Sequence, residues 1–366
     1  MKQEQQSVTG NKTSSIPYPR WRSRILSILG LLVILLLVIT FATSIGSVNI
    51  PFTTTFSVLV SKLPFIDIPI EPIDGIRVID IEKIVIDIRL PRVILAGLVG
   101  AALALAGATY QGLFRNPLAD PYLIGVAQGA ALGAVIGFLI PVSGAGIGIG
   151  LVPILAFVGA LLSVTVVYLL ARVGRTVPVT TLILAGVALG ALLGAIVAYL
   201  AITSGPMLHG IMYWLSGSFS LSQWSEVWIV LPIVAVGSII ILLFSRLLNI
   251  MQLDEEQAQQ LGINVEKLKL ILLAVATMVT AAAVSFVGII GFVGIITPHA
   301  VRLIWGPDYR FLLPLSLLSG AVFLILADIL ARTAAAPSEI PIGVITALCG
   351  APFFLYLLRR RGRTLY

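Results

Sequence analysis

Ten apolar runs of membrane-crossing or near-crossing length dominate this chain of 366 residues. A helix needs about 20 mostly apolar residues to cross the hydrocarbon core of a bilayer. In lipid, backbone N–H and C=O groups must be satisfied inside the protein, so such runs predict helices. The chain is therefore predicted to be an all-α polytopic membrane protein with about ten transmembrane helices, nine or eleven being the alternatives because one run is short. The runs span residues 25–45, 93–114, 122–140, 151–171, 181–201, 225–245, 270–290, 292–305, 311–331 and 342–358.

Composition and charge support this class and predict an orientation. Hydrophobic residues make up 58% of the chain and charged residues 11%, whereas soluble domains are about 25% charged. A net charge of +7 could suit nucleic acid, but the basic residues flank apolar runs and no nucleic-acid partner is predicted. With a cytoplasmic N-terminus, 17 of the 23 lysines and arginines fall inside. The positive-inside rule then predicts a plasma-membrane protein with both termini cytoplasmic.

The chain divides into a short tail and one transmembrane domain. Residues 1–24 are polar and predict a cytoplasmic tail, and residues 25–366 form the transmembrane domain. The run at 25–45 is too long for the apolar core of a cleaved signal peptide. Residues 47–92 form one large external segment. Its second half, Arg77–Leu90, is rich in β-branched residues and partly alternating, which predicts extended structure on the outer face.

Small residues recur at helical spacing in two of the runs. Gly129, Gly133 and Gly137 form one series, and Gly186, Gly190 and Gly194 form another. In lipid, such series let helix backbones approach closely. We interpret both as packing within one subunit rather than as a dimer motif.

Residues 246–269 form the one long polar interruption in the C-terminal two-thirds of the chain. Asp254 and Gln257 have the spacing of a capping box, which predicts the start of a short helix. Gly262 is placed to end that helix, and Asn264 can cap a second one that continues toward Lys269. Long ordered connections are usually functional, so this segment predicts a docking surface rather than a passive connector.

Several kinds of chemistry are absent from the sequence. There is no Gly-Lys pair, so the chain has no phosphate-binding loop of the P-loop kind. It has no HExxH motif and no clustered Cys/His set, and Cys349 is its one cysteine. No catalytic residue, metal site or cofactor is predicted. Asp328 is a candidate proton relay because it lies inside a span, but Arg332 four residues later can pair with it.

Most of the chain from Arg89 onward resembles the permeases of cobalamin and iron-chelate ABC importers. The longest matching block is LPRVILAGLVGAALALAGATYQGLFRNPLADPYLIGVAQGA at 90–130. The N-terminal tail and residues 47–88 do not match. The other matching blocks are LILAGVALG (182–190), MYWLSGSF (212–219), QAQQLGI (257–263), GFVGIITPHAVRLIWGPDYRFLLP (291–314), LADILAR (326–332) and EIPIGVITALCGAPFFLYLL (339–358).

The resemblance implies a set of partners. Two permease subunits, here expected as a homodimer, form the path for a metal chelate such as a ferric siderophore, haem or cobalamin. Separate ATP-binding cassette ATPase subunits dock on the cytoplasmic side, so the permease itself is not an enzyme. An extracytoplasmic binding protein delivers the substrate.

The resemblance also implies roles for residues of this chain. Residues 246–269 correspond to the cytoplasmic coupling helices that contact the ATPases, and we call them the coupling segment. Arg89 and Arg332 resemble the arginines that dock the binding protein. Residues that resemble the cytoplasmic gate are Asn116, Leu118, Thr180 and Thr181. Coupling residues implied by the match are Asp254, Gln257, Ala258, Leu261 and Gly262.

Two other hypotheses belong to different classes. An ion-coupled secondary transporter would need a network of membrane carboxylates, and Asp328 alone lies well inside a span. A structural subunit or receptor without transport would not need the gate-like RNPLADP at 115–121. We therefore expect a permease subunit that moves a metal chelate inward with ATP hydrolysed by another chain.

Overall fold

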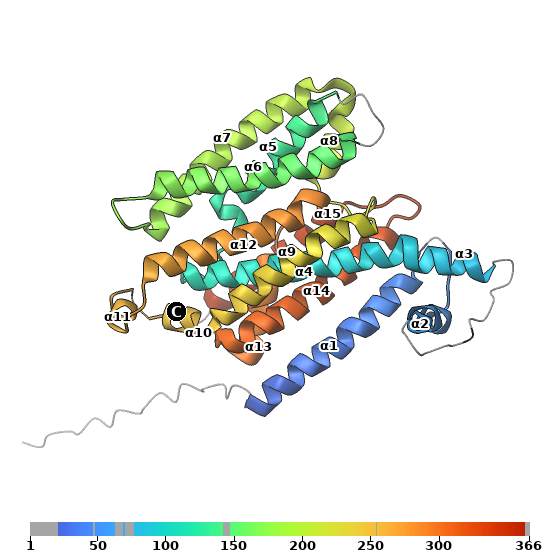
Figure 1. The fold of residues 1–366 in the computed structure, drawn as a ribbon, viewed down its shortest axis with the longest axis horizontal. Coiled ribbons are helices and arrows are strands. Elements are labelled where there is room, and N and C mark those ends of the chain that lie inside the picture. Colours follow the sequence, from blue (N-terminus) through green and yellow to red (C-terminus); the bar gives the residue numbers. More distant parts are fainter. Residues whose placement is uncertain are drawn as a thin grey trace, which may run out of the picture.

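The computed structural model describes residues 21–362 apart from 47, 63–68, 70–76, 142–146 and 254. The predicted tail before Trp21 and parts of the external segment therefore lie outside the described residues. Where the structure describes the chain, its regular elements are helices (Figure 1). They are α1 (Trp21–Ser44), α2 (Phe52–Ser61), α3 (Val78–Lys83), α4 (Leu90–Leu113), α5 (Val126–Leu139), α6 (Ile147–Ala171), α7 (Val179–Thr203), α8 (Leu208–Leu215), α9 (Trp224–Leu243), α10 (Ser245–Ile250), α11 (Glu255–Gln260), α12 (Val265–Val287), α13 (Val293–Trp305), α14 (Tyr309–Thr333) and α15 (Ile342–Gly362).

Each of the ten predicted apolar runs is a helix in the structure. In order, they are α1, α4, α5, α6, α7, α9, α12, α13, α14 and α15. Within the described residues, seven helices are long and apolar enough to cross a membrane, while the runs at α5, α13 and α15 give shorter apolar helices. The predicted all-α polytopic membrane fold is confirmed.

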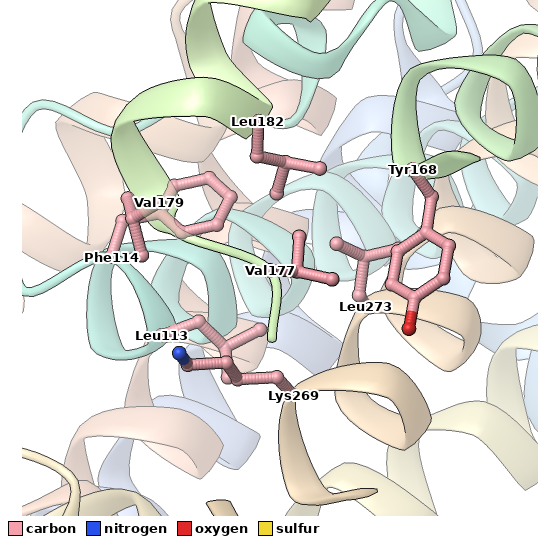
Figure 2. A pocket seen from close by; sticks show the side chains of 8 residues that line it. All are labelled: Leu113, Phe114, Tyr168, Val177, Val179, Leu182, Lys269 and Leu273. Atoms are coloured by element: carbon pink, nitrogen blue, oxygen red, sulfur yellow. The ribbon is translucent and has the colours of Figure 1, made fainter. Parts of the chain in front are cut away.

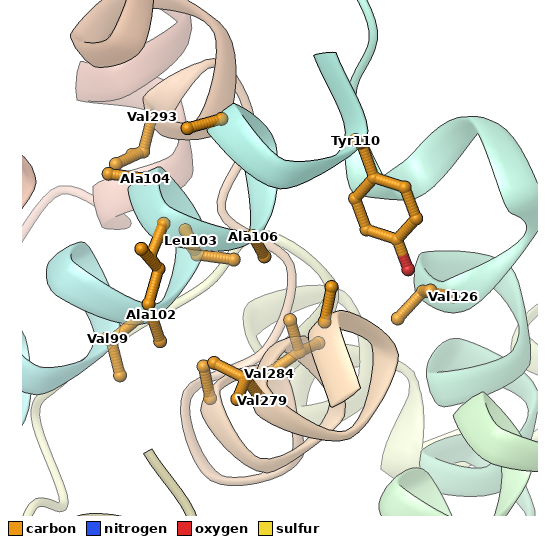
Figure 3. Close-up of a cluster of buried hydrophobic side chains, with 14 of the residues drawn as sticks. Val99, Ala102, Leu103, Ala104, Ala106, Tyr110, Val126, Val279, Val284 and Val293 are labelled. Atoms are coloured by element: carbon orange, nitrogen blue, oxygen red, sulfur yellow. The ribbon is translucent and has the colours of Figure 1, made fainter. Parts of the chain in front are cut away.

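Helix α4 is the central element around which the others pack. It contacts α14, α12, α13 and α9, and Figure 3 shows its Val99 and Leu103 in the same core as Val279 and Val284 of α12. Two glycines of α4 allow close approaches to neighbouring helices. A Cβ at Gly100 would collide with the backbone of Gly320 in α14, and a Cβ at Gly107 would collide with the backbone of Gly294 in α13. Small residues on α4 thus bring α13 and α14 close to its axis.

The glycine series behave partly as predicted. Gly129 lies against the carbonyl of Gly159, and Gly133 against that of Leu155, so the first series packs α5 closely on α6. In the second series, Gly186 lies against the Leu123 carbonyl. Gly190 and Gly194 meet only the side chain of Gln128. The prediction of packing within one subunit is therefore confirmed for the first series and for Gly186.

The two ends of the bundle carry different elements. At one end, which we call the α10 end, α10 and α11 lie beside the start of α12 (Figure 1). Hydrogen bonds join the start of α14 to α10 there, since Asn249 Nδ2 donates to Asp308 Oδ1 over 2.8 Å. At the other end, the α3 end, α3 precedes α4, and the Trp224 indole at the start of α9 donates to the Ile86 carbonyl. The connections at the α10 end and those at the α3 end are thus separated by the length of the membrane-crossing helices.

The prediction of extended structure for Arg77–Leu90 is wrong. These residues form α3 and a π-helix (Ile84–Arg89) that runs directly into α4. Ile81 and Val85 are four residues apart, so in a helix they share one face, and both pack with Val58 of α2 and Ile50. β-Branched residues carry only a small helix penalty, and this burial outweighs it. The continuous helix Val78–Leu113 has 36 residues.

The path between α12 and α13 is a break in the helical backbone. Gly288 has φ 78°, and a Cβ there would collide with the Trp214 carbonyl, so glycine is required. Tyr122 pairs with the backbone groups that the break leaves without helical partners. Its hydroxyl donates to the Ile290 carbonyl and accepts from the Ile290 amide. Broken helices are tolerated in membranes where protein groups re-satisfy the backbone in this way.

Candidate functional site

The first predicted gate segment is the turn that follows α4. Arg115 has φ 50°, which ends the helix. Asn116 Oδ1 then accepts a hydrogen bond from the amide of Leu118 over 2.9 Å, and the Asn116 carbonyl accepts one from Ala119 over 3.1 Å. This local network holds Leu118 at the surface, with 47% of its area exposed. An apolar side chain held outward by a rigid turn is suited to closing a path against a partner.

The second predicted gate segment is the start of α7. A tight turn pairs Val173 with Thr176 through two backbone hydrogen bonds of 2.9 and 3.2 Å, and Pro178 then caps α7. Thr180 is exposed in the first helical turn. Thr181 is half-buried, and its hydroxyl donates to the Pro178 carbonyl over 3.0 Å. Thr180 is thus the more accessible of the two threonines.

The structure brings these two segments to one small apolar cavity at the α10 end. Figure 2 shows side chains that line it, of which Leu113 and Phe114 come from the end of α4 and Val177 and Val179 from the start of α7. The start of α12 forms a further wall. Asn116 follows Phe114 after one intervening residue, and Thr180 directly follows Val179. The cavity is completed by Tyr168, Leu182, Lys269 and Leu273.

The coupling segment is folded as two short helices and a turn. Gly262 has φ 81°, its amide donates to the Gln259 carbonyl, and the Ile263 amide donates to the Ala258 carbonyl. This is the Schellman arrangement, so the predicted helix stop at Gly262 is confirmed. Asn264 Oδ1 accepts from the Lys267 amide over 3.0 Å, as a helix N-cap should.

The helix capped by Asn264 differs from the prediction in one respect. It is not a second short helix but the first turn of the long span α12, and the two short helices are α10 and α11. The physical reason is that no helix-breaking residue separates Lys269 from the following apolar run. Ala258 is fully buried, Leu261 is 62% exposed and Gln257 is exposed. Asp254, the predicted cap of the first helix, lies outside the described residues.

Asp308 fixes α10 to the neighbouring spans. It accepts from Asn249 and from Arg310, and the Tyr309 amide donates to Asn249 Oδ1 over 2.9 Å. Arg24 of α1 lies 3.5 Å from the same carboxylate. The hydrogen bond from Arg310 lowers the pKa of Asp308 to about 2. The carboxylate is therefore charged at neutral pH and holds three elements together.

At the α3 end, the two predicted docking arginines donate hydrogen bonds to carbonyls at the C-terminal end of α1. Arg89 Nη1 donates to the carbonyls of Thr43 and Ser44 over 3.1 and 2.8 Å. Arg332 donates to the carbonyls of Ala42 and Ile45, both over 3.1 Å. The last carbonyls of a helix have no partner within the helix, and cations at that end are favoured by the helix dipole. In this arrangement both guanidinium groups are largely buried within the chain.

Arg92 and Glu339 belong to a polar cluster that the sequence did not single out. Arg332 pairs with Asp328 as predicted, at 3.1 Å, and Arg92 also pairs with Asp328, at 2.9 Å. Arg92 reaches Glu339 as well, at 2.9 Å, and the Ser220 hydroxyl donates to Glu339 over 2.6 Å. No local sequence signal connects residue 92 with residues 328 and 339. Only the packing of α4 on α14 brings them together.

Within the part of the chain that the structure describes, no group of three or more His, Cys, Asp or Glu side chains is placed to hold a metal ion. Asp308, Asp328 and Glu339 are instead paired with arginines.

Comparison with known proteins identifies the family. The model of the FecCD transport family matches residues 32–360. The chain belongs to this family. It is 51% identical over 280 residues to the cobalamin import system permease protein BtuC of Halobacterium salinarum, covering 76% of this chain and 74% of that protein. It is 40% identical to the hemin transport system permease protein HmuU of Yersinia pestis, covering 75% and 83%.

Two further comparisons agree with this assignment. The Fe(3+) dicitrate transport system permease protein FecC of Escherichia coli is 38% identical, over 77% of this chain and 84% of that protein. A solved metal-chelate type ABC transporter in an inward-facing conformation superposes with a TM-score of 0.78 at 29% identity, covering 92% of this chain and 99% of that one. This FecCD protein is a transmembrane permease subunit of an ABC transporter, and ATP hydrolysis in such a system is carried out by separate ATPase subunits.

Proposed function

We propose that this FecCD protein is the membrane subunit of a binding-protein-dependent importer for a metal chelate. The three relatives described above carry cobalamin, hemin and Fe(3+) dicitrate in their names, and these substrates share a metal ion enclosed by an organic ligand. Cobalamin is the first substrate to test, because the relative at 51% identity carries that name.

The observation that carries the proposal is the position of the coupling segment. A capped, folded segment outside the spans presents Leu261 to solvent at the same end of the bundle as both gate turns. A folded polar segment of this length outside the spans, at the same end as both gate turns, is the feature that favours a contact with a partner protein. Gln257, Leu261 and Gly262, with Asp254, would form the surface on which the ATPase subunits dock, and the buried Ala258 would support it from inside.

The α10 end would face the cytoplasm. Arg115, Arg172 and Arg175 lie in the turns at this end, and Arg246 lies in α10. The excess of basic residues supports a cytoplasmic location for this end and for both termini, in the plasma membrane.

A second copy of the chain would complete the path. Helix α7 carries Thr180, yet only 17% of its most apolar window is buried in the chain. Most of this gate helix is therefore free to face lipid or a second copy of the chain, and a two-fold homodimer would place two α7 helices and two copies of Asn116 and Leu118 around one path. The narrow part of that path would be formed by Asn116, Leu118, Thr180 and Thr181.

The outer ends of α4 and α14 would receive the extracytoplasmic binding protein. Arg89 and Arg332 lie there and would supply guanidinium groups to carboxylates of the partner. In the present arrangement both donate to carbonyls of α1, so direct docking would require them to exchange those carbonyls for the partner's carboxylates. Their docking role stays a prediction.

Reconstitution in lipid vesicles tests the proposal. The chain alone should show no ATP hydrolysis, and accumulation of cobalamin should require ATP, an ATPase subunit and the binding protein together. Uptake by the chain alone that a protonophore abolishes would overturn the proposal in favour of an ion-coupled secondary transporter. Vesicles that hold the ATPase without this chain provide the control for background hydrolysis.

A further inference from the structure

We propose that Gln252 and Glu266 tether the coupling segment to the two gate turns, one tether for each gate. This inference rests on the proposed function, since it concerns how ATPase movement reaches the gate. Gln252 precedes α11 in the sequence and Glu266 follows it. No role for either residue was predicted from the sequence. Both act through other residues, so they are positioning residues.

The first tether joins the segment to the end of α4. Gln252 Nε2 donates to the Gly112 carbonyl over 3.1 Å and to the Leu248 carbonyl over 3.0 Å. Arg115 Nη1 reaches back to the Leu253 carbonyl over 3.2 Å. Gly112 is in the last turn of α4, and Arg115 immediately precedes Asn116. Displacement of residues 252–253 would therefore pull directly on the first gate turn.

The second tether joins the segment to the start of α7. Glu266 Oε2 accepts a hydrogen bond from the Val177 amide over 3.1 Å, and Glu266 Oε1 accepts one from Lys269 Nζ over 3.1 Å. Val177 is buried and lies outside any helix. A buried amide there needs a partner, and the Glu266 carboxylate provides it from the first turn of α12. Thr180 follows three residues after Val177.

Hydrogen bonds fix several described points of the coupling segment. Asn249 fixes α10 to Asp308, the Schellman turn at Gly262 closes α11, and Asn264 caps α12. The turn at Gly262 and the cap at Asn264 join α11 to the first turn of α12, which carries Glu266. A push on the exposed Leu261 would therefore reach Glu266 through these connections, and in our proposal the same push reaches Gln252 at the other end of the segment.

The apolar cavity of Figure 2 is lined by both gate segments. Leu113 and Phe114 come from the end of α4, while Val177 and Val179 come from the start of α7. These side chains belong to one packed apolar cluster, which holds the two segments next to each other. Hydrogen bonds from Gln252 and to Glu266 then give each gate turn its own link to the coupling segment.

Paired substitutions in the assembled permease–ATPase complex separate the tethers from simple folding effects. Glu266→Ala removes the acceptor for the Val177 amide, whereas Glu266→Gln keeps a carbonyl acceptor at the same place. Gln252→Glu has nearly the same shape but cannot donate to the Gly112 carbonyl. Each variant is measured for basal ATP hydrolysis, for cobalamin transported per ATP in vesicles with the binding protein, and for complex assembly.

We expect Glu266→Ala and Gln252→Glu each to lower transport per ATP by roughly tenfold, the effect of losing one hydrogen bond to a charged or buried group. Basal hydrolysis and assembly should not change, and Glu266→Gln should recover most of the coupling. A purely structural role for Glu266 would instead lower assembly and basal hydrolysis together. That result, or full coupling in Glu266→Ala, would overturn the proposal.

Hydrogen exchange measured by mass spectrometry locates the effect. In the wild type, trapping the ATPases with ATP and vanadate should change exchange at 255–263, at 112–119 and at 172–181. In Glu266→Ala, the change at 172–181 should disappear while those at 255–263 and 112–119 persist. In Gln252→Glu, the change at 112–119 should disappear while those at 255–263 and 172–181 persist. A response at 172–181 that survives in Glu266→Ala contradicts the tether. No response at 255–263 in the wild type contradicts the docking role on which the inference rests.

Discussion

Arg332 lies one helical turn after Asp328 on α14, and its Nε atom is 3.1 Å from Asp328 Oδ2. Arg92 from α4 approaches the same carboxylate from the other side, at 2.9 Å. Asp328 is 1% exposed. A buried carboxylate that pairs with arginines of two neighbouring helices has the arrangement of a structural junction between those helices rather than of a proton relay.

Replacing this carboxylate should destabilise the protein. Asp328→Asn leaves two largely buried guanidinium groups without their shared counter-charge, which costs about 3–5 kcal/mol where a buried pair is broken. We expect a clear fall in the thermal unfolding temperature of the detergent-solubilised protein. Glu339→Gln is the matched control, since Glu339 is more exposed and its loss should shift the temperature much less. Equal stability of Asp328→Asn and wild type would contradict the structural role.

The arginines that hold α1 can be tested for docking. Arg89→Glu and Arg332→Glu should weaken association with the binding protein and abolish uptake, while the complex with the ATPases still assembles. The reason is that a carboxylate at either position repels the partner's acidic groups. Surface plasmon resonance at low and high salt measures the affinity. A charge swap on the partner's surface glutamates should restore part of the loss.

The same variants distinguish docking from anchoring. If affinity for the binding protein is unchanged at every salt concentration, the docking role is wrong. The arginines would then serve only to hold the carbonyls of Thr43 and Ala42 at the end of α1. Limited proteolysis near residue 45 reports on that anchoring directly, because a released helix end exposes the connection to α2.

Gly262 tests the shape of the coupling segment. Its φ of 81° cannot be adopted by proline, so Gly262→Pro should uncouple ATP hydrolysis from transport by breaking the turn. The space around its Cβ position is open. Gly262→Asn is therefore the matched control, because asparagine tolerates the left-handed conformation, and it should retain most of the coupling. Substrate-stimulated hydrolysis like that of the wild type in Gly262→Pro would count against a docking role.

Asn116 and Leu118 test the position of the gate. Asn116→Ala removes the acceptor that holds the Leu118 amide, and Leu118→Ala removes the exposed side chain. Both should raise the leak of preloaded cobalamin from vesicles, while Asn116→Asp, which keeps an acceptor, should leak less than Asn116→Ala. If neither alanine variant alters leak or uptake, Asn116 and Leu118 do not form the constriction, and Thr180 and Thr181 become the residues to test.

Local patterns in the sequence were sufficient for the parts of the structure that depend on nearby residues. The ten apolar runs are helices because in lipid a backbone can satisfy its own hydrogen bonds only in that way. The stop at Gly262 and the cap at Asn264 depend on backbone conformation and on side chains within a few residues. The pair of Asp328 with Arg332 lies within one helical turn. Each of these features was predicted from residues adjacent in the chain.

Tertiary packing decided what local patterns could not. Residues 77–90 are helical because Ile81 and Val85 bury against α2, which outweighs the weak preference of β-branched residues for strands. The contact of Arg92 with Asp328 and the hydrogen bond from Val177 to Glu266 join residues 236 and 89 positions apart in sequence. Contacts over such separations depend on how whole helices pack, since the chain between them sets neither distance nor direction. Sequence by itself thus determined which segments cross the membrane and where the coupling turn ends, whereas the tertiary structure decided which buried charges meet and how the coupling segment reaches the gate.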